Sequence, residues 1–585
     1  MISRYDYFII GFYLVFLVVI GLVFRRMSKD TSDYFRAGGA MPWWLTGVSA
    51  WIFSFTAWTF TGAAGKVYET GTLVLAVFYS TIFALIFALI WTGVRFRRMR
   101  VITWMEAVRH RYGPATEQFY IWIKVPQLLF FAGVTLNAVG VFMAAVFHMD
   151  MNTILIVLGA VVTVVAFAGG SWAVLASDFV QALLVVTITI CTAAMVLARP
   201  EIGGLDGLIH KVPSSQFHWT ELTRPEFIIM WILANLWFKF SDENNMERSP
   251  SYLMTRSDRD ARRMVWIPLI GTLIGPLIWF IPSMAATIMH PNLAAEYPLL
   301  KQPHEAAFVA VSLDVMPRGL IGLLICAMLG ATVTQMDTGL NRNVGITIRS
   351  LYKPVFMPHA SEKQLLVAGK ICTLLFGFII IICALLVNKF RTIGLFDLAN
   401  QFAANIIMPL ALPLIYGLFY KRTPGWSAWS TALIAGVSSW LLGHYVKPEF
   451  FQHLMGWKTA LSADGRTYLT LAATTFGTVG IGTAWYFFTS IFYKSSPPEN
   501  RERIEKFFTD LRTPVDEQGV GGVQTAVYKL LGGLCLVYGA FVLLLTFIPN
   551  RFNGRLCFLF CGGVIFTIGA ILFSISKRRA THKPK

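Results

Sequence analysis

Long apolar runs fill most of this sequence and decide what the chain can fold into. A helix needs about 20 apolar residues to cross a bilayer, and in lipid every backbone amide and carbonyl must be satisfied within its own segment. The sequence therefore predicts an all-α polytopic membrane protein with about 15 transmembrane helices. The candidate spans are residues 7–24, 45–65, 73–94, 119–147, 152–168, 174–198, 227–241, 265–289, 319–345, 366–388, 395–420, 426–446, 467–493, 526–548 and 556–576.

The composition supports this class and excludes others. Hydrophobic residues make up 56% of the 585 residues and charged residues only 14%, whereas soluble domains carry about 25% charged residues. A soluble multidomain protein, a disordered chain and a coiled coil are therefore excluded. The seven cysteines form no CxxC pair and lie in or beside apolar runs, which is typical of small buried side chains. No Walker A or HExxH motif occurs, so we expect no enzyme activity.

The basic residues indicate the orientation of the chain. With the N-terminus outside, 30 of the 49 lysines and arginines fall in connections on the inner side and 13 in connections on the outer side, as the positive-inside rule requires. The sequence thus predicts a multi-pass protein of the cell (plasma or inner) membrane, with the N-terminus outside and the C-terminus in the cytoplasm. The net charge of +18 then reports topology, and no nucleic-acid partner is expected.

Ionisable side chains within the spans are the clearest functional signal, because each costs a few kcal/mol in lipid unless it is paired or hydrated. Thr334, Asp337 and Thr338 are spaced i, i+3, i+4 and share one helix face. Two hydroxyls and a carboxylate are oxygen ligands that suit Na⁺, and Asp178 could add a second carboxylate. The alternative is that the hydroxyls bond to their own helix and that Asp337 pairs with Arg342 or a lysine.

The run 45–65 carries polar residues at mid-membrane depth, within the segment Ser54 to Thr59. An unwound helix there would free carbonyl groups for a cation, as in transporters with discontinuous helices. The alternative is an ordinary helix whose hydroxyls bond to its own backbone. The short run 227–241 could be a partner half-helix, because two such segments five spans apart are typical of an inverted five-helix repeat.

Four motifs in order resemble the sodium–solute symporter family, which includes sodium–glucose, sodium–proline and sialic-acid transporters. The first, DYFRAGGAMPWW at residues 33–44, is similar to the family's entry to its first core helix. The others are GGSWAVLASD at residues 169–178 followed by Gln181, GLFYKRTPGWSA at 417–428, and FFTDLRTPVD at 507–516. Together they extend the resemblance over about residues 5 to 520.

The resemblance implies the LeuT-type fold, with two inverted five-helix repeats and alternating access driven by Na⁺. The first repeat would occupy residues 40–200 (spans 2–6) and the second residues 225–421 (spans 7–11). The remaining parts would be an extra N-terminal helix in 1–30, peripheral helices in 425–493, a cytoplasmic linker at 494–525 with a short amphipathic helix at 503–511, and two C-terminal helices with a basic tail in 526–585.

The resemblance also implies two sodium positions. The main one would use the carbonyls of Ile52, Phe55 and Ala331 and the hydroxyl of Thr334, while Gln335 stands where the family has a second hydroxyl. A second position would use Asp178, Asp337 and Thr338. An aspartate at 337, where serine is usual, could strengthen cation binding or let a proton replace Na⁺.

The residues that would contact the solute diverge more from the family. They are Ser54, Thr56, Trp58 and Thr59 in the first core helix, Asn245 in the sixth and Asn400 in the tenth. The sugar branch's glutamate and lysine are absent near Phe78–Tyr79 and at Thr272. Lys239, with Lys66, could favour an anionic solute such as a carboxylate.

These observations predict a secondary active transporter that couples Na⁺ to a small polar organic solute, with the lipid bilayer as its surroundings. One alternative keeps the fold but uses a proton carried by Asp178 or Asp337. Another is a transport-inactive sensor or scaffold that retained the helical bundle.

Overall fold

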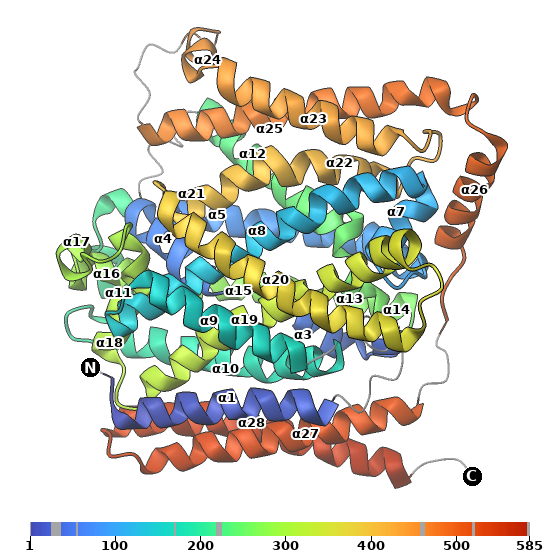
Figure 1. Ribbon diagram of the computed structural model, residues 1–585. Coiled ribbons are helices and arrows are strands. Elements are labelled where there is room, and N and C mark those ends of the chain that lie inside the picture. The colour runs from blue at the N-terminus through green and yellow to red at the C-terminus, as the bar shows by residue number, and fades with distance from the viewer. Residues whose placement is uncertain are drawn as a thin grey trace.

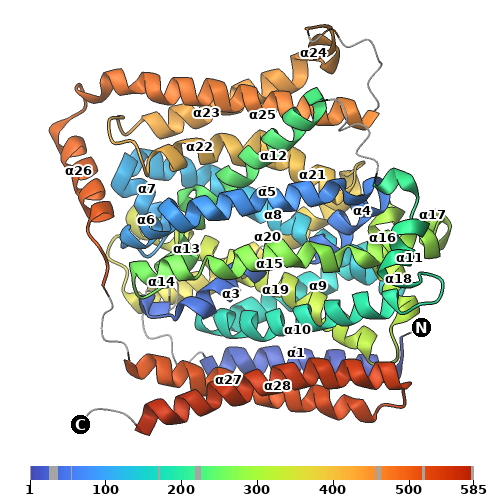
Figure 2. The same cartoon turned by 180° about the vertical axis from the view of Figure 1, so that it is seen from behind.

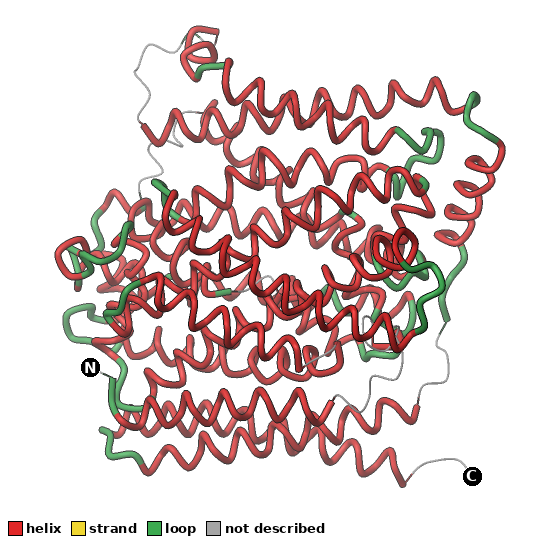
Figure 3. Tube along the Cα trace, viewed as in Figure 1, coloured by secondary structure: helices red, strands yellow, loops and turns green. Residues whose placement is uncertain are grey.

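The computed structural model describes residues 2–24, 37–53, 56–168, 171–217, 225–454, 456, 463–516 and 521–581. Regular structure over these residues is helical (Figure 3). The one strand-like pairing among them is an isolated bridge between Met41 and Thr255. The expected all-α architecture is therefore confirmed.

All fifteen predicted spans are occupied by helices. The first eight are α1 (Arg4–Phe24), α3 (Trp43–Phe53) with α4 (Ala64–Thr70), α5 (Val74–Phe87) with α6 (Gly93–Arg98), α8 (Pro114–Phe147), α9 (Met151–Ala168), α10 (Ser171–Leu197), α12 (Pro225–Asn244), and α15 (Trp266–Trp279) with α16 (Ile281–Met289). The other seven are α19 (Leu320–Ile346), α20 (Glu362–Phe390), α21 (Leu395–Phe402) with α22 (Met408–Tyr416), α23 (Ser427–Tyr445), α25 (Ala463–Phe488), α27 (Gly521–Leu544) and α28 (Phe552–Thr581). Nine stretches within the described residues are long and apolar enough to cross a membrane, so the chain is a multi-pass membrane protein.

The second span is interrupted, whereas the seventh is not. Helix α3 ends at Phe53, Thr56 is non-helical, and a π-helical segment, η3 (Thr59–Ala63), leads into α4. In contrast, α12 is one continuous helix of 20 residues. Its interior contains neither glycine nor proline, so nothing in the backbone forces a break. The expectation that run 227–241 is a half-helix is therefore wrong.

The helices lie roughly along one direction and define two ends of the molecule (Figures 1 and 2). One, the N-terminal end, carries the N-terminus, α11 (Gly204–Lys211), α17 (Leu293–Glu296) and α18 (Ala307–Val315). The other, the α26 end, carries α7 (Trp104–Tyr112), α13 (Ser249–Leu253), α14 (Asp258–Arg263) and α26 (Pro498–Arg512). Helices α1, α27 and α28 cover one edge of the bundle, and α23 and α25 cover the opposite edge.

Small residues let the central helices approach closely, as is typical of membrane bundles. A Cβ atom on Gly133 of α8 would lie 2.7 Å from the Cβ of Cys383 in α20. One turn further along α8, the amide of Asn137 donates to the carbonyl of Ala384 across 2.7 Å. Helix α8 is thus held against α20 by contact of the two backbones.

Helix α26 is the amphipathic helix predicted around residues 503–511. It buries Ile504, Phe507, Phe508 and Leu511 and begins five residues earlier than expected, because Pro498 is suited to the first turn of a helix. Arg100, two residues beyond the end of α6, donates to the carbonyl of Asp510 across 2.8 Å. The linker between α25 and α27 therefore packs on the bundle rather than hanging free.

Candidate sodium and solute site

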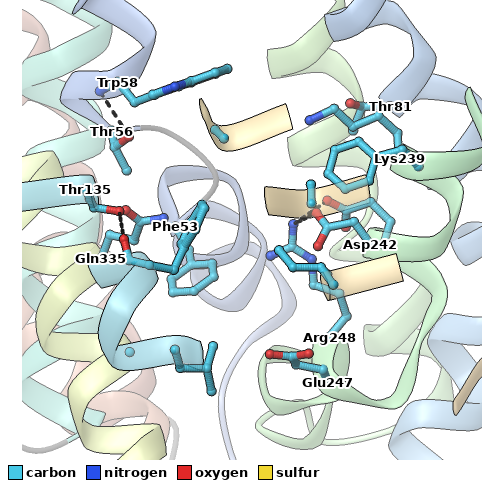
Figure 4. Close-up of a pocket in the computed structure, with 18 of the residues that line it drawn as sticks. Phe53, Thr56, Trp58, Thr81, Thr135, Lys239, Asp242, Glu247, Arg248 and Gln335 are labelled. Atoms are coloured by element: carbon cyan, nitrogen blue, oxygen red, sulfur yellow. Dashed lines mark hydrogen bonds and ion pairs between the residues drawn. The ribbon is translucent and has the colours of Figure 1, made fainter. Parts of the chain in front are cut away.

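A cavity of about 310 Å³ lies beside the interruption between α3 and η3. Helices from both halves of the chain line it, namely α3, α5, α8, α12, α15, α19 and α21. Many lining side chains are aromatic, among them Trp51, Trp58, Phe78 and Trp279. Figure 4 shows Thr56, Trp58 and Gln335 on one side and Lys239, Asp242 and Arg248 on the other. Aromatic rings beside polar side chains that can fix the orientation of a ligand are typical of a small-molecule site.

The cavity extends toward the α26 end. Its lining includes Trp104, at the start of α7, and Arg248, in the 3₁₀ segment η7 (Met246–Arg248). On the opposite side, the Trp58 ring stacks on Phe396 with a centroid distance of 5.6 Å. The Trp58 indole also donates to the carbonyl of Leu395 across 3.3 Å. This stack separates the cavity from the N-terminal end.

Two ion-pair clusters hold the N-terminal end together beyond Trp58. Arg391, between α20 and α21, forms a bidentate pair with Glu305 of the 3₁₀ segment η8 (Pro303–Ala306), at 2.9 and 3.0 Å, and both side chains are buried. The Nζ of Lys66 in α4 lies 3.5 Å from the Oδ2 of Asp397 and 3.3 Å from the Oε2 of Glu69. None of these residues lines the cavity. Lys66 is thus engaged in holding α4 to α21, away from the expected solute site.

The predicted main sodium position falls where the interrupted helix meets α19. Ile52 and Ala331 are both fully buried there. The backbone amide of Ala57, just past the interruption, donates to the hydroxyl of Thr332 across 3.2 Å. Phe55 and the side chain of Thr334 lie outside the described residues.

Gln335 faces the same region from α19. Its side chain lines the cavity, and its Oε1 is buried without a hydrogen-bond donor among the described residues. A buried carbonyl oxygen without a donor carries a desolvation cost that a bound cation or solute donor would offset. The residue at which this chain departs from the family pattern therefore keeps an oxygen available to a ligand.

Asp178, from the predicted second sodium position, is fully buried on α10. The hydroxyl of Ser49, one turn before Ile52 in α3, donates to its carboxylate. Ser49 was not predicted, because its only signal is the i, i+3 spacing from Ile52 on α3. The side chains of Asp337 and Thr338 lie outside the described residues, so their positions relative to Asp178 stay predictions.

Five of the seven residues predicted to contact the solute line this cavity: Thr56, Trp58, Lys239, Asn245 and Asn400. Thr59 does not line it and is buried within η3, and Ser54 lies outside the described residues. Asn245 has a structural task as well, because its side chain accepts from the amide of Glu247 across 2.8 Å and caps η7.

The cavity also holds charged residues whose pairing the sequence did not predict. Arg248 pairs with Glu243 at 2.6 Å and with Asp242 at 3.1 Å. Glu247 pairs at 2.6 Å with Lys124, whose side chain is fully buried in α8. Arg342 of α19 completes the charged lining. The Lys124–Glu247 pair joins residues 123 positions apart, which spacing along one helix could not reveal. The two pairs of Arg248 join residues five and six positions apart across the end of α12.

Comparison with known proteins identifies the class. The family model "Sodium:solute symporter family" matches residues 34–435, so the chain belongs to that family of sodium-coupled transporters. It is 24% identical over 454 residues to "Sodium/myo-inositol cotransporter 2" of Oryctolagus cuniculus, covering 71% of this chain and 66% of that one. It is 20% identical over 436 residues to "Sodium/sialic acid symporter SiaT" of Proteus mirabilis (strain HI4320), covering 72% of this chain and 86% of that one.

A solved structure shares the fold. The outward-open, substrate-bound state of a Na⁺-coupled sialic acid symporter superimposes with a TM-score of 0.66, at 16% identity, over 85% of this chain and 99% of that one. At this identity the likeness concerns the fold, and the expected LeuT-type fold is confirmed. The chain spans about two thirds of the length of the inositol cotransporter and most of the length of the bacterial symporters.

Proposed function

We propose that this chain carries a small polar organic solute across the cell membrane together with Na⁺, by alternating access, and that it performs no chemical conversion. The observation that supports this most directly is the cavity at the interrupted helix. Thr56, Trp58 and Asn400 meet there, beside a buried amide oxygen of Gln335 that has no donor among the described residues. Discontinuous helices near the middle of the membrane are the usual place for such binding sites in transporters.

Sodium occupies the junction of the interrupted helix with α19. The ligands are the carbonyls of Ile52, Phe55 and Ala331 and the side chains of Thr334 and Gln335. A second cation position uses Asp178, Asp337 and Thr338. The hydrogen bond between Ala57 and Thr332 supports this placement, because it holds the two elements against each other across the fold.

The two inverted repeats are residues 40–200 and 225–421, with the N-terminus outside and the C-terminus in the cytoplasm. In this orientation the α26 end faces the cytoplasm. The cavity then opens toward the inside while the Trp58–Phe396 stack closes the outer side. This arrangement is the one expected of the state from which solute and Na⁺ leave.

Coupling requires that Na⁺ favour the state that binds solute, since a ligand shifts an equilibrium only by its differential affinity for the two states. Sodium at the junction of α3, η3 and α19 would set the position of Thr56 and Trp58 relative to Gln335. Solute and Na⁺ would therefore each raise the affinity for the other.

Uptake into proteoliposomes tests the proposal. The purified chain is given an inward Na⁺ gradient, an equal K⁺ gradient or an inward proton gradient, with radiolabelled sialic acid and myo-inositol as first probes. We expect accumulation above equilibrium only with the Na⁺ gradient. Accumulation driven equally by the proton gradient would contradict sodium coupling, and sodium-dependent binding without any uptake would indicate a sensor or scaffold.

A further inference from the structure

Arg342 places a positive charge on the wall of the cavity. The proposed transport function gives this charge no role. Gln335, Gly339 and Arg342 are spaced i, i+4, i+7 and line the cavity from one face of α19. Arg342 lies seven residues beyond Gln335, about 10 Å along the helix axis, toward the α26 end. A solute leaving the Thr56–Gln335 region in that direction would pass it.

The carboxylates of the cavity already have basic partners. Glu247 is paired with Lys124 at 2.6 Å. Asp242 and Glu243 share Arg248, at 3.1 and 2.6 Å. The three acidic side chains therefore lie against two basic ones.

Lys239 and Arg342 are the basic residues of the cavity lining that belong to none of these ion pairs. Over the part of the chain that the structure describes, neither has a carboxylate oxygen within ion-pair distance. Counting Lys124 behind the wall, the group holds four basic and three acidic side chains. A negative charge on a bound solute would be attracted by Lys239 and Arg342.

Arg342 has the geometry to receive that charge. Its Nη2 donates to the hydroxyl of Ser251 at 3.4 Å, and its guanidinium lies 4.5 Å from the centre of the Phe53 ring. Its Nε is buried and has no hydrogen-bond acceptor among the described residues. The Nε–H donor is thus unused among the described residues, and the planar fork of the guanidinium matches a carboxylate.

Gly339 leaves the approach to Arg342 open. A Cβ atom at this position would meet no other atom within 4 Å. Any larger side chain at 339 would therefore project into the space between Gln335 and Arg342.

We propose that Arg342 is the residue that selects the charge of the solute, and that its guanidinium binds a single carboxylate on a small organic anion. Lys239 adds to the attraction from α12, on the side of the cavity opposite Gln335 (Figure 4). This inference rests on the proposed symport function and names the substrate class of the same site. A bound anion compensates a cation whose burial is otherwise costly.

The test uses small organic acids, each paired with its uncharged methyl ester, beginning with N-acetylneuraminate. Sodium-driven uptake of each pair is measured in proteoliposomes that hold the native chain, Arg342→Gln or Arg342→Lys. We expect the native chain to prefer the acid. Arg342→Gln should raise the half-saturating concentration of the acid roughly 10- to 100-fold and leave that of the ester unchanged, and Arg342→Lys should restore part of the loss.

Arg349→Gln is the matched control, because Arg349 lies two turns further along, pairs with Glu106 at 2.8 Å and does not line the cavity. Stabilisation of each variant by Na⁺ alone reports whether it has folded. Equal uptake of acid and ester, or equal impairment of both by Arg342→Gln, would overturn the charge-selecting role and leave symport intact. Absence of sodium-driven uptake of every probe by the native chain would instead overturn the proposed function.

Discussion

The backbone amide of Ala57 and the hydroxyl of Thr332 are joined by a buried hydrogen bond of 3.2 Å between residues 275 positions apart. Ala57 follows the interruption of the second span, and Thr332 follows Ala331 at the middle of α19. The bond therefore fixes the distance between the two elements that we propose to hold sodium.

Thr332→Val should weaken sodium binding. The substitution keeps the shape of the side chain and leaves the amide of Ala57 without its acceptor, at a cost of about 1–3 kcal/mol. We expect the half-saturating Na⁺ concentration for thermal stabilisation to rise roughly tenfold. Thr373→Val in α20 is the control, because the buried hydroxyl of Thr373 donates to Gly369 in its own helix. Equal half-saturating Na⁺ concentrations for the two variants would argue against a sodium site at the junction of the interrupted helix with α19.

Asp178→Asn should also reduce sodium affinity. The carboxylate is fully buried and accepts from Ser49, and a neutral amide attracts a cation less strongly. We expect sodium-driven uptake to need roughly tenfold more Na⁺. Asp150→Asn, at an exposed position that caps the start of α9, should titrate like the native chain. If uptake by Asp178→Asn kept its normal dependence on Na⁺ but lost its dependence on pH, the result would favour Asp178 as a proton carrier.

Arg391→Gln should open the N-terminal end. Removing one partner of a buried ion pair leaves an uncompensated charge and costs about 3–5 kcal/mol, and here the uncompensated charge would be that of Glu305 at the closed N-terminal end. In an Ala399→Cys background, which places the reporter on the cavity wall, we expect a membrane-impermeant maleimide to react faster when Arg391→Gln is added. Lys301→Gln, at an exposed position on the same end, should not change the rate. An unaltered rate with Arg391→Gln would show that the pair does not control access.

Gly133→Ala should destabilise the bundle. The new Cβ would lie 2.7 Å from the Cβ of Cys383 and 2.9 Å from the amide nitrogen of Ala384, so α20 would have to move. Overpacking of this kind costs about 1–3 kcal/mol, and the thermal unfolding midpoint in detergent should fall. Gly436→Ala in α23, where a Cβ meets no atom within 4 Å, should leave the midpoint unchanged or raised. Equal midpoints would contradict the close contact of α8 with α20.

Much of the fold could be predicted because lipid allows so few backbone conformations. Each apolar run became one or two helices, and the polar segment around Thr56 marked the interruption. The continuous α12 was missed because its short apolar stretch ends in charged residues, which in the structure belong to the same helix and to the cavity wall.

The candidate site was predictable only where a single helix carried the signal. Thr56, Trp58 and Lys239 were found in this way and do line the cavity, as does Asn400, which the family resemblance indicated. Ser49, the Lys124–Glu247 pair and the cavity-lining position of Arg342 were not found. Those depend on which helices face one another, and spacing along one helix does not contain that information.

The sodium dependence of uptake by Asp337→Ala tests the central claim most directly. Asp337 shares a helix face with Thr334 and Thr338, and the proposal makes it a cation ligand. With uptake measured across a series of Na⁺ concentrations at constant ionic strength, we predict that the half-saturating Na⁺ concentration rises at least about tenfold while the variant still folds. A half-saturating concentration equal to that of the native chain would contradict the claim that sodium binds against α19 and drives transport.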